Sequence, residues 1–203
     1  MTVSRGGHSR LYCNENSAKC EILHHVSLVH REKTPFQELR VYDTKYMGRI
    51  LLLDGQVQIS DEFDDNYTID MSKEIVKEGN TYNHILIIGG GDMLIANYLL
   101  ENFQTEVKKI TVCEIDERVV ENVRKYFKMS ENINAAIDSG RLNLVFKDGA
   151  EYAKSLAEKG ELVDGIIVDC TDVWLEDGVA SSLFTVDFYK ALNSCMNKGA
   201  RFS

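Results

Sequence analysis

The sequence HILIIGGGD, residues 84–92, combines a near-continuous apolar run with three glycines and a closing acid. A short, fully apolar run bounded by glycines is typical of a strand buried inside a parallel sheet. The glycines allow the backbone to pass close to a ligand where the strand gives way to a helix. The next residues, MLIANYLLENF (93–103), have the apolar spacing of that helix. We therefore predict a β–α unit with a ligand-binding turn.

The same alternation continues toward the C-terminus. Strand-like runs occur at 108–116 (KKITVCEID), 141–149 (RLNLVFKDG) and 163–172 (VDGIIVDCTD), and each is followed by a helical pattern, at 117–127, 150–160 and 183–196. Repeated β–α units with apolar strands indicate a parallel sheet covered on both faces. The predicted fold class is α/β, with a Rossmann-like parallel sheet of the methyltransferase type.

A different pattern precedes this sheet. Residues 20–32, 36–44 and 48–60 are rich in β-branched residues and partly alternate, and LDG at 53–55 marks a tight turn. Residues 61–78 then show helical spacing. We predict a small antiparallel β unit, an N-terminal β-hairpin unit over residues 1–60, followed by a Rossmann-like domain over residues 61–203.

Acidic residues stand at the carboxyl ends of all four predicted strands. They are Asp92, Glu114 with Asp116, Asp148, and Asp169 with Asp172. A single acid at a strand–helix turn is most simply a helix N-cap. Because ligands of open α/β sheets bind at the carboxyl ends of the strands, acids at four successive ends favour a binding site instead.

The ligand class follows from the spacing of these groups. The glycine run alone is shared by dehydrogenases and many methyltransferases, and Leu94 occupies the place of the third glycine of a dinucleotide fingerprint. Glu114 stands about 25 residues beyond Gly89, where a carboxylate can bind ribose hydroxyls. Asp148 and Gly149 can face an adenine amino group. Asp92 would repel a pyrophosphate. These positions therefore suit an adenosine-type cofactor that has no pyrophosphate.

Composition limits the partners. The chain has 23 basic and 32 acidic residues, a net charge of −9. This balance argues against a nucleic-acid partner and suits a polycationic small molecule.

No apolar run is long enough to span a bilayer, and the first ten residues do not resemble a signal peptide. We expect no membrane partner and a cytoplasmic location. The five cysteines match neither a zinc site nor a disulfide framework, so we expect no metal.

Several motifs together resemble one family. TPFQELRVYDTKYMGRILLLDGQVQ (34–58), then DEF and Tyr67, IIGGGD, VCEID, KDG and DCTD, are similar in order and spacing to polyamine aminopropyltransferases, the spermidine/spermine synthase family. The similarity runs from about residue 33 to the end. It implies decarboxylated S-adenosylmethionine as a co-substrate, no tightly bound cofactor, a polyamine as acceptor, and a homodimer or larger homo-oligomer.

The resemblance also assigns roles to individual residues. It implies that Asp169 is the catalytic base. The positions implied to bind the donor are Gln37, Gly89, Gly91, Asp92, Glu114, Asp148 and Gly149. Those implied to bind the acceptor are Gln58, Tyr67, Asp169 and Asp172.

The chain departs from the family in four places. The family's GGGDGG reads GGGDML, which puts side chains at Met93 and Leu94 and predicts weaker donor binding. The family's Tyr-His/Gln-Glu reads Tyr67-Thr68-Ile69, which is closer to the spermine synthase branch. Trp174 follows DCTD, where it is either a polyamine contact or a hydrophobic lid residue. The sequence ends at GARFS, within the strand after the last predicted helix, so we expect a domain truncated at its C-terminus. It is either a fragment or a shortened relative whose sheet edge is completed by a partner.

Three functions stay open at this point. The first is an active aminopropyltransferase that makes spermidine or spermine and releases methylthioadenosine. The second is a non-catalytic spermidine synthase-like subunit, suggested by Met93, Leu94 and Ile69. The third is a methyltransferase that uses intact S-adenosylmethionine.

Overall fold

The computed structural model describes residues 2–5, 8–14, 20–24, 26–62, 66–170 and 180–203. The chain divides into two compact units, Met1–Asp64 and Asp65–Ser203, and each is described by itself. Within the described residues, no helix has the length and apolar character needed to cross a membrane.

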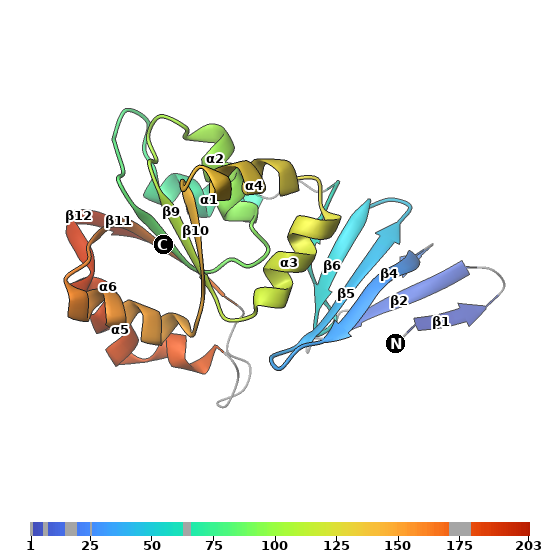
Figure 1. The fold of residues 1–203 in the computed structure, drawn as a ribbon. Helices are drawn as coiled ribbons and strands as arrows, with labels where there is room; N and C mark the ends of the chain where they lie inside the picture. Colours follow the sequence, from blue (N-terminus) through green and yellow to red (C-terminus); the bar gives the residue numbers. More distant parts are fainter. Residues whose placement is uncertain (1, 6–7, 15–19, 25, 63–65, 171–179) are drawn as a thin grey trace. The chain divides into compact units, whose positions relative to one another are not determined.

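The apolar runs of the second unit form a single parallel sheet (Figure 1). Its strands are β8 (Ile85–Gly89), β9 (Ile110–Glu114), β10 (Leu142–Phe146), β11 (Val163–Asp169) and β12 (Met196–Phe202). Their order is β10-β9-β8-β11-β12, and every neighbouring pair is parallel. The predicted α/β fold with a Rossmann-like sheet is therefore confirmed.

Helices cover both faces of this sheet. They are α1 (Asn66–Ile75), α2 (Leu94–Asn102), α3 (Glu117–Tyr126), α4 (Ser130–Asp138), α5 (Gly149–Lys159) and α6 (Val186–Ser194), with a short 3-10 helix η1 (Ser181–Phe184) before α6. Helices α5 and α6 lie together on one face, and α1, α2 and α4 lie on the other (Figure 1). Helix α4 was not predicted from the sequence, and α1 is shorter than the predicted 61–78.

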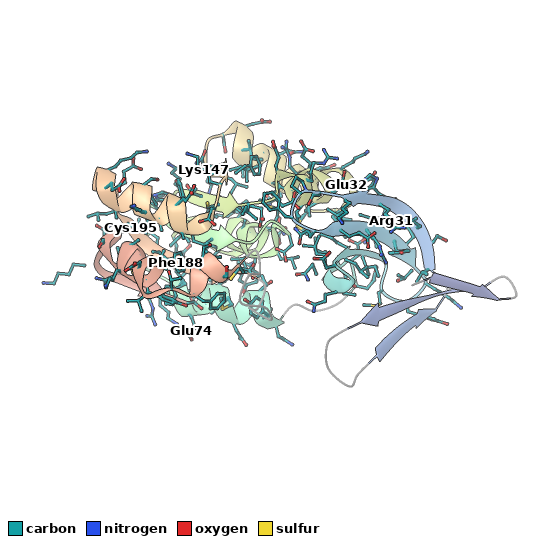
Figure 2. The ribbon with its side chains drawn as sticks, turned by 90° about the horizontal axis from the view of Figure 1, so that it is seen from below. Arg31, Glu32, Glu74, Lys147, Phe188 and Cys195 are labelled. Carbon is teal, nitrogen blue, oxygen red and sulfur yellow. The ribbon has the colours of Figure 1, made fainter. Side chains whose placement is uncertain are left out.

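Alternation along the central strand builds two cores. Leu86 and Ile88 of β8 pack with α5 and α6, whereas Ile85 faces the other side, toward α1. On the α6 side the largest buried side chain is Phe188, near Cys195 at the end of the helix (Figure 2). Burying such a side chain stabilises the fold by roughly 1.5–3 kcal/mol. These cores hold the strand ends, and the loops that follow them, in fixed positions.

The first unit consists of two antiparallel sheets. One sheet has the order β1-β2-β3, formed by Thr2–Arg5, His8–Asn14 and Cys20–His24. The other has the order β4-β5-β6-β7, formed by Val26–Lys33, Glu38–Thr44, Arg49–Leu53 and Gln56–Ser60. The predicted tight turn is present: Asp54 and Gly55, both with positive φ, join β6 to β7 in the way that two-residue hairpins favour.

The strand order of the parallel sheet fixes where a ligand binds. β8 lies between β9 and β11, so the connection after β8 leads toward one side of the sheet and the chain later returns on the other. Such a reversal opens a crevice at the carboxyl ends of the two central strands. The glycine loop after β8 and Asp169, the last residue of β11, both lie at this edge.

Candidate functional site

The glycine loop is held against the end of β11. Gly89 and Gly90 have φ of +79° and +66°, a region that side chains disfavour. The amide of Gly90 donates to the carbonyl oxygen of Asp169 at 2.8 Å. A Cβ added at Gly89 would lie 2.0 Å from that same oxygen. The loop therefore needs glycine here for its close backbone packing, and this packing places the Asp169 side chain beside the loop.

Glu114 lies beneath the same loop at the end of β9. Its Oε2 accepts from the amide of Gly91 at 3.0 Å, and its Oε1 accepts from the amide of Asp116 at 2.9 Å. Burial raises the pKa of Glu114, and the backbone amides that donate to it partly oppose that rise. A Cβ at Gly91 would lie 2.7 Å from Oε2. Backbone amides thus fix the carboxylate at the carboxyl end of β9, the position from which an acid of this fold class can accept from ribose hydroxyls.

Asp92 follows the glycines and is half-buried. Its Oδ1 accepts from the amide of Leu94 at 3.1 Å, at the start of α2. Between them, Met93 has a φ of +66° and no exposed surface. Its side chain thus lies in the core and does not fill the mouth of the loop. The substitution of glycine by methionine at this position strains the backbone instead of covering the ligand site.

Tyr67, on α1, and Asp169 face each other across this edge of the second unit. The phenol oxygen donates to Oδ1 of Asp169 at 3.2 Å. Tyr67 is 54% exposed, and the partial burial of its phenol raises its pKa above the usual value. The charge of Asp169, and after it those of Cys170 and Asp92, raise that pKa further. The phenol therefore stays a neutral donor at physiological pH. This hydrogen bond joins α1 to the end of β11, and the bond from the Gly90 amide to the Asp169 carbonyl joins the glycine loop to the same residue.

Asp148 and Gly149 lie where β10 leads into α5. Oδ1 of Asp148 accepts from the amides of Ala150 at 2.8 Å and Glu151 at 3.0 Å, so Asp148 is the N-cap of α5. Its Oδ2 accepts from the hydroxyl of Ser182 at 2.9 Å. Ser182 was not predicted from the sequence, because nothing in its local pattern distinguishes it from any other loop serine.

Some of the strand-end acids have the simpler role of helix caps. Asp116 is almost fully buried and accepts from the amide of Arg118 at 3.1 Å, which caps α3. Asp148 caps α5 in the same way. Asp92, Glu114 and Asp169 lie at the carboxyl ends of β8, β9 and β11, and none of them is the N-cap of α2, α3 or α5. In the described part of the chain, no group of three or more histidine, cysteine and acidic residues has the arrangement of a metal site.

The remaining candidates are Gln37, Gln58 and Asp172. Gln37 is half-buried, and its backbone closes a turn with Thr34, whose hydroxyl accepts from the Gln37 amide at 3.1 Å. Gln58 lies on β7 at the point where the pairing with β6 shifts by one residue, a bulge of the kind that re-aims side chains. Both belong to the first unit, and their contact with a ligand stays a prediction. Asp172 and Trp174 lie outside the described residues.

The fold and the site together define a Rossmann-like protein with several carboxylates at the carboxyl ends of its central strands. Residues 66–203 match the protein family described as "Spermine/spermidine synthase domain". Residues 16–61 match the family described as "Spermidine synthase tetramerisation domain". The chain therefore belongs to the spermine/spermidine synthase family.

Curated relatives agree with this family. The chain is 36% identical over 172 residues to a polyamine aminopropyltransferase of Thermoanaerobacter sp. (strain X514), covering 82% of this chain and 56% of the relative. It is 36% identical over 177 residues to that of Serratia proteamaculans (strain 568), covering 87% and 58%. The chain thus spans somewhat more than half the length of these relatives.

Solved structures give the same fold. A spermidine synthase in complex with the transition state analogue AdoDATO matches with a TM-score of 0.76 and 25% identity, over 93% of this chain and 60% of that one. The spermidine synthase of Thermotoga maritima matches with a TM-score of 0.74 and 23% identity, over 96% and 62%, and this second likeness bears on the fold alone.

Proposed function

We propose that this protein is an aminopropyltransferase that moves the aminopropyl group of decarboxylated S-adenosylmethionine to a polyamine and releases methylthioadenosine. The observation that carries the proposal is the Tyr67–Asp169 pair at 3.2 Å, with Asp92 close enough to influence the same phenol. Two carboxylates and a neutral phenol at one crevice suit substrates that carry several positive charges.

The donor supplies two of those charges. Decarboxylated S-adenosylmethionine has a sulfonium and a terminal ammonium and lacks the methionine carboxylate. Asp92 attracts the ammonium, whereas the carboxylate of the intact cofactor would be repelled by the same side chain. Glu114 accepts from the ribose hydroxyls, and Asp148 with Gly149 faces the adenine. The glycines Gly89 and Gly91 let the donor approach the backbone.

The acceptor must lose a proton before it attacks. An alkyl amine has a pKa near that of lysine, about 10, so deprotonation at pH 7 costs roughly 4 kcal/mol. Asp169 binds the ammonium and takes its proton. The freed nitrogen lone pair then attacks the aminopropyl carbon beside sulfur, the new C–N bond forms, and the C–S electrons leave with methylthioadenosine. Tyr67 orients Asp169 through its hydrogen bond.

The remaining assignments belong to the same proposal. Gln37 completes the donor site, and Gln58 and Asp172 complete the acceptor site. The acceptor is putrescine or spermidine. The protein works in the cytoplasm as a homodimer or larger homo-oligomer, a state supported by the match of residues 16–61 to a tetramerisation domain. Light scattering from the full chain measures that state directly.

Donor discrimination tests the site itself. Calorimetry with decarboxylated and with intact S-adenosylmethionine should give tighter binding of the decarboxylated form. Asp92→Asn should reduce that preference by about tenfold, because one charge interaction in a half-buried site is lost. Tighter binding of the intact cofactor by the wild-type protein would instead identify a methyltransferase.

A further inference from the structure

Asp148 has a nearly complete set of hydrogen-bond partners. Oδ1 accepts from two amides at the start of α5, those of Ala150 and Glu151, and this fills both of its lone pairs. Oδ2 accepts from the hydroxyl of Ser182 at 2.9 Å. One acceptor position is therefore left on Oδ2 by these contacts. A carboxylate with both oxygens fixed presents that last position in a single direction.

Ser182 is itself held firmly. It belongs to η1, and its carbonyl accepts from the hydroxyl of Thr185, the N-cap of α6, at 3.2 Å. The neighbouring Leu183 is buried, and its side chain would lie 3.0 Å from a Cβ at Gly149. The 3-10 turn and the start of α5 thus pack directly on each other. Any Cβ at Gly149 would also lie 2.4 Å from Ile88, so neither side of this contact can shift easily.

We propose that Ser182 is a positioning residue for recognition of the donor's adenine. Its hydroxyl orients Asp148 so that the remaining acceptor position of Oδ2 receives one N–H of the exocyclic amino group. The inference rests on the proposed function, because it assumes that the donor's base lies against Asp148. It adds a residue on a separate element, η1, to the recognition of the base.

The test uses binding of the full chain to two probes, methylthioadenosine and methylthioinosine, whose base carries an oxygen in place of the amino group. Ser182→Ala should weaken binding of methylthioadenosine by about tenfold, the scale of one hydrogen bond to a charged group. Methylthioinosine should bind equally to both proteins, since it offers no amino group to Asp148. Ser182→Thr, which keeps the hydroxyl, should restore binding to within about twofold.

A matched control is Ser155→Ala. Ser155 lies on α5 and donates locally to the carbonyl of Tyr152 at 2.8 Å, so this variant loses a similar bond on the helix that Asp148 caps. It should leave the affinity for both probes unchanged. Ser182→Cys, close in size and a weaker donor, supplies a second measurement and should give an intermediate loss.

Steady-state kinetics separate positioning from general damage. Ser182→Ala should raise KM for decarboxylated S-adenosylmethionine and leave kcat nearly unchanged, because Asp169 lies on a different strand. Equal losses of affinity for both probes, or wild-type affinity of Ser182→Ala for methylthioadenosine, would overturn the inference. Wild-type protein that does not bind methylthioadenosine would overturn the proposed function as well, which is a distinguishable result.

Discussion

Asp169 and Asp148 show how one residue type takes different roles at neighbouring strand ends. Oδ1 of Asp148 is committed to the amides that begin α5, so that oxygen serves the fold. Oδ1 of Asp169 accepts from a side-chain hydroxyl, the phenol of Tyr67. A side chain can rotate away when a charged amine arrives, whereas a helix N-terminus cannot. For this reason we propose Asp169, and not Asp148, as the proton acceptor.

Removing the Asp169 carboxylate charge tests that role. Asp169→Asn should cut turnover by at least about a hundredfold, the usual contribution of a general base. The matched control is Asp187→Asn, which makes the same change at an exposed acid of α6 whose partner is Lys190 at 3.6 Å. Steady-state turnover of the Asp187→Asn variant should equal that of the wild-type protein. Near wild-type turnover in Asp169→Asn would remove Asp169 from the mechanism.

Met93 combines a strained backbone with a buried side chain. Met93→Ala keeps the strain and loses buried volume, at a cost of roughly 2–5 kcal/mol. Met93→Gly loses one more carbon but relieves a left-handed conformation that disfavours any Cβ, by roughly 1–2 kcal/mol. Urea unfolding should therefore show the wild-type protein as the most stable, Met93→Gly as less stable and Met93→Ala as the least stable. A glycine variant less stable than the alanine variant would contradict the observed φ.

The residues of the site differ in how well the sequence could predict them. Asp92, Glu114 and Asp169 are predictable because parallel strands bring their carboxyl ends together whatever the loops do. The packing of Gly89 on Asp169 and the burial of Met93 depend on exact backbone contact, which a single sequence does not encode in any local pattern. Ser182 depends on a contact with Asp148, 34 positions earlier. Contacts of that kind appear only in three dimensions.

The strands and most helices follow from local patterns, since apolar runs and 3.6-residue spacing report burial directly. Helix α4 was missed because residues 130–138 carry only a short apolar stripe, which includes the buried Ile133 and Ala136. Packing on α3 and β10 stabilises this helix more than the helix propensity of its residues does. The predicted length of α1 was wrong for a similar reason: helical spacing continues past Ile75, where the structure has already turned.

The opposite ends of the strands carry a pH-dependent contact. His84 precedes β8, and its Nε2 lies 2.8 Å from the hydroxyl of Thr111 on β9. Burial lowers the pKa of His84 below its usual value near 6.5, and the Lys109 charge lowers it further, against the opposing effects of Asp164 and Glu161. The unfolded chain therefore binds a proton more readily than the folded one.

The sign of the effect on stability follows. His84 contributes its stability above pH 6.5, and this stability is lost as pH falls through the lower folded pKa. His84→Gln should remove the part of the fall in unfolding free energy that is due to protonation of His84. Urea unfolding followed by helical circular dichroism, at pH values from about 7.5 down to about 5, measures it, because every helix of the described residues lies in the second unit. Identical declines in both proteins would contradict the lowered pKa.

The chain joins an antiparallel β unit to a Rossmann-like unit, and it spans somewhat more than half the length of its curated relatives. Its acidic balance, 32 acidic against 23 basic residues, agrees with substrates that are cations. Release of the reaction product tests the proposed activity most directly.

That product is methylthioadenosine. Full-length protein is incubated with decarboxylated S-adenosylmethionine and either putrescine or spermidine, and methylthioadenosine is quantified. We predict release that depends on one of the two amines, which would establish aminopropyl transfer and name the acceptor. Folded protein that releases none with either amine would contradict the proposed activity and identify a non-catalytic member of the family.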